Sequence, residues 1–212
     1  MELRHEVPEG GEDRVAELYW EAFGRKLGAA LGPAPAGRAF IAAHLHRDRA
    51  VTAIEGGRIV GVAGFRVGGY GLTGGTAGDV LRAYGVPRGL LRLPLLALLE
   101  RTPAAGQLVM DGIAVDPGCR GSGIGGRLLA EVYAVAAAHG CTEVRLDVID
   151  VNPRARALYE RQGFKAGRTE QTPWLRRLMG FGAVTTMHRA ITPAAPLTPD
   201  TPHTPRTPGA AA

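Results

Sequence analysis

The first half of the chain changes from a helical to a strand-like pattern of apolar residues. Apolar side chains at positions 15, 18, 19 and 22 follow the spacing of one helix face and predict an amphipathic helix over residues 12–23. A similar pattern predicts a second helix over residues 36–47. Residues 51–55 and 58–67 are then rich in β-formers and flank Gly56-Gly57, the signature of a tight hairpin.

A glycine-dense segment and a leucine-rich segment separate this hairpin from the second half of the chain. The leucine-rich run over residues 80–101 predicts a helix that is broken near Pro87 and Pro94. We expect its leucines to face the core, and the alternative is an exposed apolar lid or partner surface.

The second half of the chain alternates strand and helix patterns. Asn152-Pro153 is a strong helix start, with the asparagine as N-cap and the proline at the first helical position. The predicted elements are a strand over 107–115, a helix over 123–139, a strand over 143–151, a helix from 153 to 161, and strands over 164–169 and 184–189.

The last residues have a composition of their own. Proline recurs at every third position from 193 to 208, between threonines and alanines. This period would place the prolines on one edge of a polyproline II helix, which could serve as a docking tail. We expect instead a disordered tail over residues 191–212, after a single domain that ends near residue 190.

The composition is that of a soluble globular protein of one domain. The chain has 212 residues, 45% hydrophobic and 21% charged, with a net charge of +5. No run of like charges indicates a nucleic acid partner, and no apolar stretch is long enough to span a membrane. Cys119 and Cys141 are too few for a disulfide framework and lack metal-ligand spacing, so we expect a cytoplasmic protein without a metal.

The strongest candidate for chemistry is a glycine-rich turn between a strand and a helix. It reads Arg120-Gly121-Ser122-Gly123-Ile124-Gly125-Gly126. Residues without a Cβ let the backbone wrap closely around a ligand and point successive N–H groups at it, and the helix dipole reinforces that field. Arg120 adds a full positive charge. This arrangement suits a pyrophosphate.

Two common nucleotide-binding motifs fit this turn poorly. A P-loop requires a lysine after its last glycine, and none follows here. The dinucleotide-binding fingerprint places its first glycine directly after a strand, whereas this turn opens with Asp116-Pro117 and an arginine.

The turn resembles the signature of the GNAT superfamily of acetyltransferases, which is Gln/Arg-x-x-Gly-x-Gly/Ala. Arg120, Gly123 and Gly125 match it, and the preceding Ile113-Ala114-Val115-Asp116-Pro117 has the typical form. A second match is Asn152-Pro153-Arg154-Ala155-Arg156-Ala157-Leu158-Tyr159, followed by Gly163-Phe164. The resemblance covers about residues 1 to 190 in element order. It implies an α/β fold with a mixed, mostly antiparallel sheet, flanked by helices and splayed at the cofactor site.

The resemblance also implies how the acetyl-CoA cosubstrate is held. Pantetheine would pair with the backbone of one strand, and the pyrophosphate would lie on the glycine-rich turn. A backbone N–H of that strand could polarise the thioester carbonyl. The implied cofactor-binding residues are Ile113, Ala114, Val115, Arg120, Gly121, Ser122, Gly123, Ile124, Gly125, Gly126 and Asn152.

Three residues are candidates for catalysis. In family members the equivalent of Tyr159 usually points at the thioester sulfur and can protonate the leaving thiolate; the alternative for Tyr159 is a half-buried core aromatic. The acceptor amine must lose a proton before it attacks, which requires a carboxylate or a water chain. Asp111 and Asp147 lie on the two strands that splay in this fold, and either one could be the base or a structural aspartate. By simple alternation, Asp111 would share a side of its strand with Val109 and Ile113.

The resemblance identifies the donor and leaves the acceptor open. The expected reaction is transfer of an acetyl group to a primary amine, of a small molecule or a peptide, by direct attack in a ternary complex. Residues 68–105 are longer than in minimal family members and would shape the acceptor site in a monomer or homodimer. The alternative is a non-catalytic protein of the same fold that binds acyl-CoA as a sensor or interaction module.

Overall fold

The computed structural model describes residues 1–100, 102–173 and 176–192. The predicted tail from residue 193 onward lies outside these residues. In chain order the elements are β1 (Glu2–Arg4), α1 (Glu12–Leu31), α2 (Ala34–Ala43), η1 (Arg47–Arg49), β2 (Ala50–Glu55), β3 (Arg58–Arg66), α3 (Ala77–Tyr84), α4 (Val86–Leu99), β4 (Gln107–Val115), η2 (Pro117–Cys119), α5 (Ile124–Ala138), β5 (Glu143–Ile149), α6 (Pro153–Arg161), β6 (Lys165–Gln171), α7 (Arg176–Met179) and β7 (Ala183–Ala190).

One mixed sheet organises the described residues. Its strand order is β1-β2-β3-β4-β5-β7-β6. Every neighbouring pair is antiparallel except β4 and β5, which run parallel and pair only from Gln107 to Val109 and from Glu143 to Arg145. Beyond that point the two strands have no ladder between them, so the predicted mixed, mostly antiparallel sheet with a splay is confirmed.

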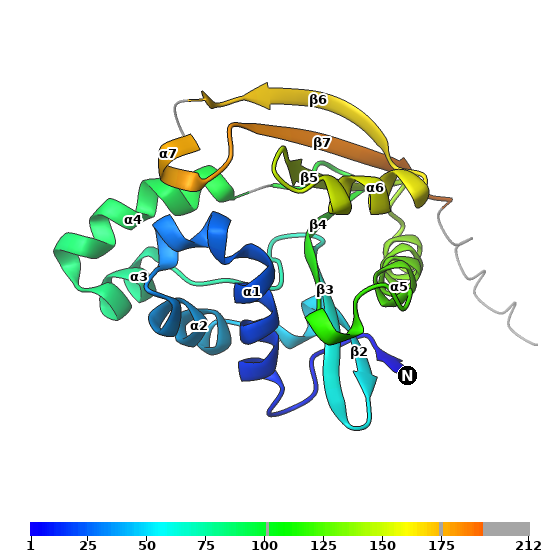
Figure 1. Ribbon diagram of the computed structural model, residues 1–212, viewed down its shortest axis with the longest axis horizontal. Helices are drawn as coiled ribbons and strands as arrows, with labels where there is room; N and C mark the ends of the chain where they lie inside the picture. Colours follow the sequence, from blue (N-terminus) through cyan, green and yellow to red (C-terminus); the bar gives the residue numbers. More distant parts are fainter. Residues whose placement is uncertain (101, 174–175, 193–212) are drawn as a thin grey trace, which may run out of the picture.

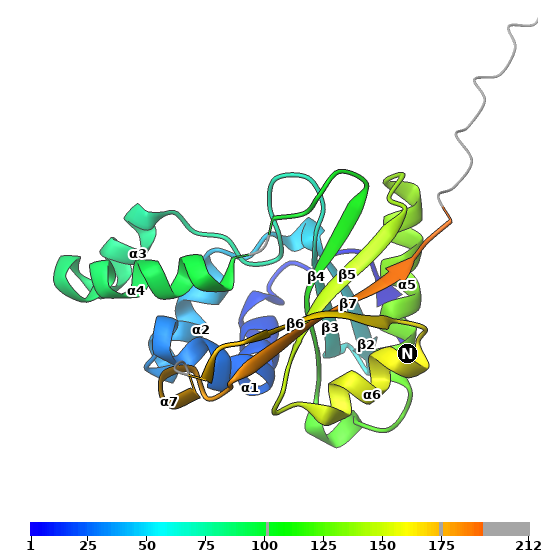
Figure 2. The ribbon, with the colours of Figure 1, turned by 90° about the horizontal axis from the view of Figure 1, so that it is seen from above.

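Helices cover both faces of this sheet. Helices α1 to α4 and α7 lie on one side, and α5 and α6 lie on the other (Figure 1, Figure 2). One face of α5 is buried against the strands, with Leu128 and Val132 fully covered. Helix α1 buries Val15 and Leu18 against the opposite face. The sheet therefore separates an α5 side from an α1 side.

Two predicted helix boundaries differ from the structure. Helix α1 continues to Leu31 rather than ending near residue 23, because Ala30 and Leu31 extend its buried face. Helix α2 ends at Ala43, since His44 leaves the helical conformation and its N–H already donates to the carbonyls of Phe40 and Ile41.

Helices α3 and α4 differ from the expectation for the leucine-rich run over residues 80–101. The break lies at Gly85, because Pro87 sits in the first turn of α4, where a missing N–H costs nothing, and α4 continues past Pro94. One side of α4 contacts α1, and its Leu93, Leu95 and Leu96 pack against an apolar cluster formed by residues of α1, α2 and α3. Its other side exposes Leu90 and Leu91, by 55% and 75%. The expectation that its leucines face the core therefore holds for only one side of the helix.

The helices of the described residues also bear on membrane insertion. None of them combines the length and the apolar character that a membrane crossing requires.

Candidate functional site

A cavity of about 280 Å³ opens where β4 and β5 separate. It lies between the middle of α1, the two splayed strands and the start of α6. Its lining residues are Glu21, Ala22, Phe23, Arg25, Lys26, Met110, Asp111, Gly112, Leu146, Asp147, Val148, Ile149, Val151, Asn152, Ala155 and Tyr159. The structure therefore brings the three candidate catalytic residues, Asp111, Asp147 and Tyr159, to one cavity.

Asp111 occupies a β-bulge of β4. Gly112 pairs with Gly64 and Met110 with Phe65, so Asp111 has no residue opposite it on β3. The extra residue resets the alternation of the strand. The expectation that Asp111 shares a side with Ile113 is wrong for this reason, because Ile113 packs on the α5 side while Asp111 lies in the cavity on the α1 side.

The long segment of residues 68–105 and one arginine hold the Asp111 carboxylate. The N–H of Leu72 donates to its Oδ2 at 2.8 Å, and the Nε of Arg66 lies 3.9 Å from its Oδ1. Burial raises the pKa of Asp111, and the Leu72 hydrogen bond and the Arg66 charge oppose that shift. A Cβ on Gly71 would collide with the same carboxylate, so the insert packs directly on Asp111.

Asp147 lies across the cavity on β5. Its neighbours Leu146 and Val148 are buried toward α5, so strand alternation turns Asp147 to the α1 side, where 11% of its side chain is exposed. The Thr186 hydroxyl donates to its Oδ1 at 2.8 Å, and a guanidinium nitrogen of Arg145 lies 3.7 Å from the same oxygen. Two oriented carboxylates therefore border the cavity.

Tyr159 closes the cavity from α6. Its ring packs edge-on against Phe164 with centroids 5.7 Å apart, and the residue is only 7% exposed. Burial, with a smaller contribution from Tyr133, raises the pKa of Tyr159 to about 12. The hydroxyl is therefore protonated at neutral pH and can donate a proton. Because Tyr159 is buried and also lines the cavity, it can be a core aromatic and a general acid at once.

The glycine-rich turn forms a loop of open amides at the start of α5. Gly121 and Gly123 have φ of +87° and +84°, which is the left-handed region that favours glycine, and an added Cβ on either would meet no protein atom within 4 Å. Within the part of the chain that the structure describes, the N–H groups of residues 121–125 donate to no backbone carbonyl. Open space and free donors at a helix N-terminus suit an anion.

The remaining residues of the turn have a second role. A Cβ on Gly125 would lie 3.2 Å from Leu158, and one on Gly126 would lie 3.3 Å from the side chain of Gln162. These two glycines therefore let α5 approach α6 closely. Since α6 carries Tyr159, the same packing fixes the anion loop relative to the cavity.

Arg120 and Asn152 connect the loop to its surroundings. The Nε of Arg120 donates to the Val115 carbonyl at 3.1 Å, and its guanidinium reaches Glu21 of α1 at 3.2 Å. Asn152 caps α6 by accepting from the Ala155 N–H at 3.2 Å, as predicted, and it also lines the cavity.

Strand β4 lies between the loop and the cavity. Ile113, Ala114 and Val115 pair with β3 on one edge. Among the described residues, their other edge has no ladder partner on β5. Apart from the Val115 carbonyl, which accepts from Arg120, this stretch of backbone is therefore available to a ligand that runs from the loop to the cavity.

Asp116 braces the entry to the loop, and sequence reasoning did not identify this role. Its carboxylate accepts from the Gly118 N–H at 2.9 Å and from guanidinium groups of Arg14 and Arg58. The Gly118 hydrogen bond is the largest cause that lowers the pKa of Asp116, and the two arginines add to it. The arginines come from positions 102 and 58 residues away in the chain, so local sequence gives no signal for this contact.

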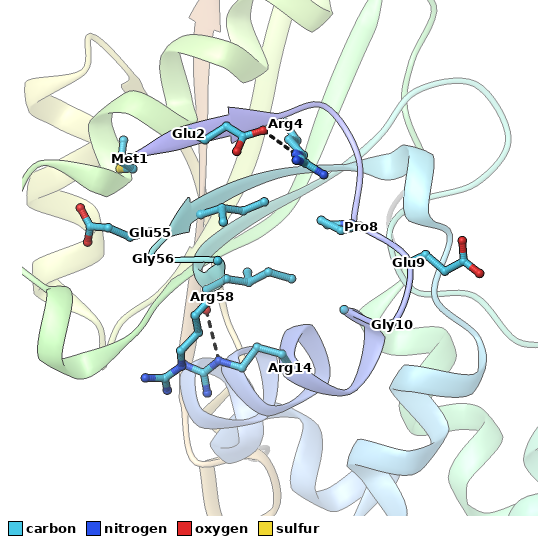
Figure 3. Close-up of a pocket in the computed structure, with 14 residues that line it drawn as sticks. Met1, Glu2, Arg4, Pro8, Glu9, Gly10, Arg14, Glu55, Gly56 and Arg58 are labelled. Atoms are coloured by element: carbon cyan, nitrogen blue, oxygen red, sulfur yellow. Dashed lines mark hydrogen bonds and ion pairs between the residues drawn. The ribbon is translucent and has the colours of Figure 1, made fainter.

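A second hollow of about 660 Å³ lies at the other end of α1, beside the β2–β3 hairpin (Figure 3). Arg4 pairs there with Glu2, and Arg14 donates to the Ile59 carbonyl. Arg58 pairs with Asp116. The arginines of this hollow are thus engaged by protein oxygens, and it contains none of the candidate catalytic residues.

The splayed strands, the amide loop and the enclosed tyrosine and carboxylates together define a protein of the acyltransferase class. The sequence model of the Acetyltransferase (GNAT) family matches residues 13–164. The chain therefore belongs to this family.

Sequence relatives match part of the chain. The thialysine N-epsilon-acetyltransferase of Bos taurus is 34% identical over 98 residues, which are 45% of this chain and 57% of that protein. The enzyme of the same name from Sus scrofa is 33% identical over 98 residues, again 45% of this chain and 57% of that protein. The chain thus spans little more than half the length of these curated relatives.

Solved structures share the whole fold. One is a ribosomal-protein-alanine N-acetyltransferase from Brucella melitensis, 17% identical, with a TM-score of 0.58 over 90% of this chain and 100% of that one. Another is a phosphinothricin acetyltransferase from Sinorhizobium meliloti in complex with AcCoA, 16% identical, with a TM-score of 0.54 over 94% and 96% of the two chains. At these identities the likeness concerns the fold alone.

Proposed function

We propose that this protein transfers an acetyl group from acetyl-CoA to a primary amine by direct attack in a ternary complex. The observation that carries the proposal is the shared cavity of Asp111, Asp147 and Tyr159 at the point where β4 and β5 separate. A free strand edge leads from that cavity to the amide loop at α5. The amine named for the sequence relatives, a lysine analogue, supports an amine acceptor.

The donor would lie along β4. The amides of residues 121–125 would hold the pyrophosphate, and Arg120 would add its charge beside them. The free edge of Ile113 to Val115 would pair with the pantetheine amides and direct one N–H at the thioester carbonyl. Asn152 lines the same path and keeps α6 in place.

The acceptor enters as an ammonium ion and must lose one proton before it can attack. We assign the base to Asp111, because burial raises the pKa of this carboxyl and so makes it a better proton acceptor near neutral pH. Asp147, oriented by Thr186, would hold the ammonium opposite. The Leu72 hydrogen bond keeps the Asp111 carboxylate turned to the cavity.

The transfer then forms one bond and breaks one. The amine nitrogen bonds to the thioester carbon as the carbon–sulfur bond breaks, and Tyr159 donates its proton to the departing thiolate. The new amide nitrogen releases its second proton to solvent, and Asp111 passes the first one to solvent as well. Neither Cys119 nor Cys141 lines the cavity, which agrees with a route that has no acetyl-enzyme. Tyr159 regains a proton from solvent after CoA leaves.

The test measures CoA thiol release with a panel of amines for the wild type and for Tyr159→Phe. We expect the substitution to lower kcat by about 10²-fold, a typical contribution of a general acid, with little change in KM for acetyl-CoA. Tyr133→Phe is the matched control, because Tyr133 is also partly buried beside Phe164 but lies outside the cavity. It should keep the wild-type kcat.

Two results would contradict the proposal. Acetyl-CoA binding without turnover on any amine would indicate the sensor alternative. Equal rates for Tyr159→Phe and Tyr133→Phe would remove Tyr159 from the mechanism.

A further inference from the structure

Helix α4 is apolar on the side that faces solvent as well as on the side that packs. Among the α4 side chains that the structure describes, every exposed one except Arg88 is apolar. At 3.6 residues per turn they fill one continuous arc of about 140°. A surface helix normally turns polar residues outward, so this face has the composition of an interface. Its members, here called the outer stripe, are Val86, Pro87, Leu90, Leu91, Pro94, Ala97 and Leu98.

The outer stripe is large enough to form a contact site. Val86, Leu90, Leu91 and Leu98 are exposed by 60%, 55%, 75% and 40%. These four residues alone expose roughly 400 Å² of mostly apolar surface, a size at which patches often mark a contact site. Two outer stripes packed on one another would bury about 1,000 Å² in total, which is the lower limit of a specific protein–protein interface.

The surroundings of the outer stripe favour a second copy of the chain as its partner. Helix α4 lies at one edge of the molecule and the end of β7 at the opposite edge (Figure 1, Figure 2). Residues 193–212, which follow β7, contain Leu197 as their only large apolar residue and offer α4 little to pack against. An anionic membrane attracts helices with a basic flank, whereas the exposed charges at the ends of this stripe, Arg88 and Glu100, balance.

The spacing within the outer stripe suits packing against another helix. Pro87, Leu91, Pro94 and Leu98 follow one another at intervals of four, three and four residues. This is the spacing of the seam along which two helices pack side by side. Leu90 and Ala97 border the seam on one side and widen its apolar surface.

The end charges of α4 indicate the direction of the second helix. Arg88 lies in the first turn of α4 and Glu100 directly follows its last residue, so each charge opposes the helix dipole at its own end. In the described part of the chain, no side chain caps the N-terminus of α4 and no acidic residue lies in its first turn. Glu100 is 65% exposed and lies 3.8 Å from Arg66. An antiparallel second α4 would bring the opposite dipole end to each of these charges.

We infer that this protein forms a homodimer in which the outer stripes of two α4 helices pack antiparallel about a two-fold axis close to Leu91. Such a contact is isologous, because each copy contributes the same residues. None of the outer-stripe residues lines the cavity of Asp111, so the inference is independent of the proposed function. The modest size of the interface predicts a dissociation constant in the micromolar range.

Sedimentation equilibrium of the full chain tests the dimer. The average mass of the wild type should rise with concentration from the 22.3 kDa of one chain toward twice that value. Leu91→Glu should raise the dissociation constant at least about a hundredfold, because the dimer would lose two buried leucines and bury two carboxylates. Ala134→Glu is the matched control, since it adds the same charge at an exposed position of α5, on the other side of the sheet, and should leave the constant unchanged.

The variants should fold like the wild type. Leu91 is already 75% exposed, so its substitution removes little packing from one chain. Circular dichroism and thermal melts check this directly. Leu90→Glu, at a position that is 55% exposed, is the second variant and should also abolish the dimer.

Cysteine cross-linking tests the direction of the two helices. Cys119, which is partly exposed, is first replaced by serine, and Cys141 is buried. Leu91→Cys should then form a disulfide-linked dimer under mild oxidation. Val86→Cys should not, because in the antiparallel pair its two copies would lie about 15 Å apart along the helices, beyond the reach of a disulfide.

Arg88→Glu separates dimer formation from helix stability. An acidic residue in the first turn of α4 would favour the helix dipole of one chain, so the melting temperature of the monomer should stay or rise. The same residue would meet the negative end of the partner helix. We therefore expect the dissociation constant to increase about tenfold at low salt and less at high salt.

Several results would overturn the inference and leave the proposed function standing. They are a wild type that stays monomeric at about 100 μM, and a dimer that persists in both Leu91→Glu and Leu90→Glu. Cross-linking of Val86→Cys in place of Leu91→Cys would exclude the antiparallel arrangement. Binding of monomers to phosphatidylcholine–phosphatidylserine vesicles, lost in Leu91→Glu, would assign the outer stripe to a membrane instead.

Discussion

Two glycines at opposite ends of α5 allow a matched test of the anion loop. Gly123 precedes the helix with φ of +84°, and Gly140 follows it with φ of +67°. An added Cβ would meet no atom within 4 Å at either position. Gly123→Ala and Gly140→Ala therefore impose the same kind of backbone strain without a steric clash.

The expected magnitudes follow from this geometry. A left-handed conformation costs an L-residue about 1–2 kcal/mol, so both variants should lose about that much free energy of unfolding. Only Gly123 lies in the loop of free amides. When the backbone at position 123 relaxes this strain, several N–H groups of the loop change direction. We therefore expect acetyl-CoA affinity to fall by at least about tenfold, the equivalent of one charge-assisted hydrogen bond.

The assay combines denaturant unfolding with calorimetric titration of acetyl-CoA. Gly140→Ala should bind acetyl-CoA as the wild type does, despite its lower stability. Wild-type affinity in folded Gly123→Ala would refute the loop assignment, and so would equal losses of affinity in the two variants.

Four further predictions concern the carboxylates. Asp111→Asn should lower kcat by about 10²-fold, and Asp147→Asn should mainly raise KM for the amine; steady-state kinetics separates the two roles, and the reverse pattern would exchange them. Because the pKa of Asp111 is raised in the folded protein, wild-type stability falls as pH rises through that pKa. Thermal melts should therefore show the stability of Asp111→Asn relative to the wild type increasing with pH. A difference that stays constant with pH would contradict the burial of this carboxyl. Gly71→Ala should lower both stability and kcat because its Cβ would press on Asp111, and unchanged kinetics would show that the insert does not position this residue. The pKa of Asp116 is lowered in the folded protein, so its stabilising contribution is present above the ordinary aspartate pKa and is lost as pH falls through the folded value. In a plot of the free energy of unfolding against pH, Asp116→Asn should therefore lose less stability at acid pH than the wild type does.

The motif-bearing half of the fold could be predicted from sequence because its signals are local. The strand over residues 107–115, the Asn152 cap and the glycine-rich start of α5 each depend on residues that are neighbours in the chain. Short elements such as β1 were missed, since three residues carry no period and β1 forms through its pairing with β2.

The candidate site was harder to predict, because its decisive features arise from pairing between distant segments. The bulge at Asp111 depends on the register between β3 and β4, and no residue pattern near position 111 predicts it. The hold of Leu72 on that carboxylate depends on how the insert folds back over the sheet. Sequence alternation therefore placed Asp111 on the correct strand and on the side of Val109, but wrongly placed Ile113 on that side as well.

A crystal structure with CoA bound would show directly whether the cofactor runs from the amide loop along β4 to the cavity. We expect the pyrophosphate within hydrogen-bond distance of the amides of residues 121–125, the pantetheine paired with Ile113 to Val115, and the sulfur beside the Tyr159 hydroxyl. A pyrophosphate bound instead in the hollow lined by Arg4 and Arg58, or a sulfur directed away from the cavity of Asp111, would contradict it.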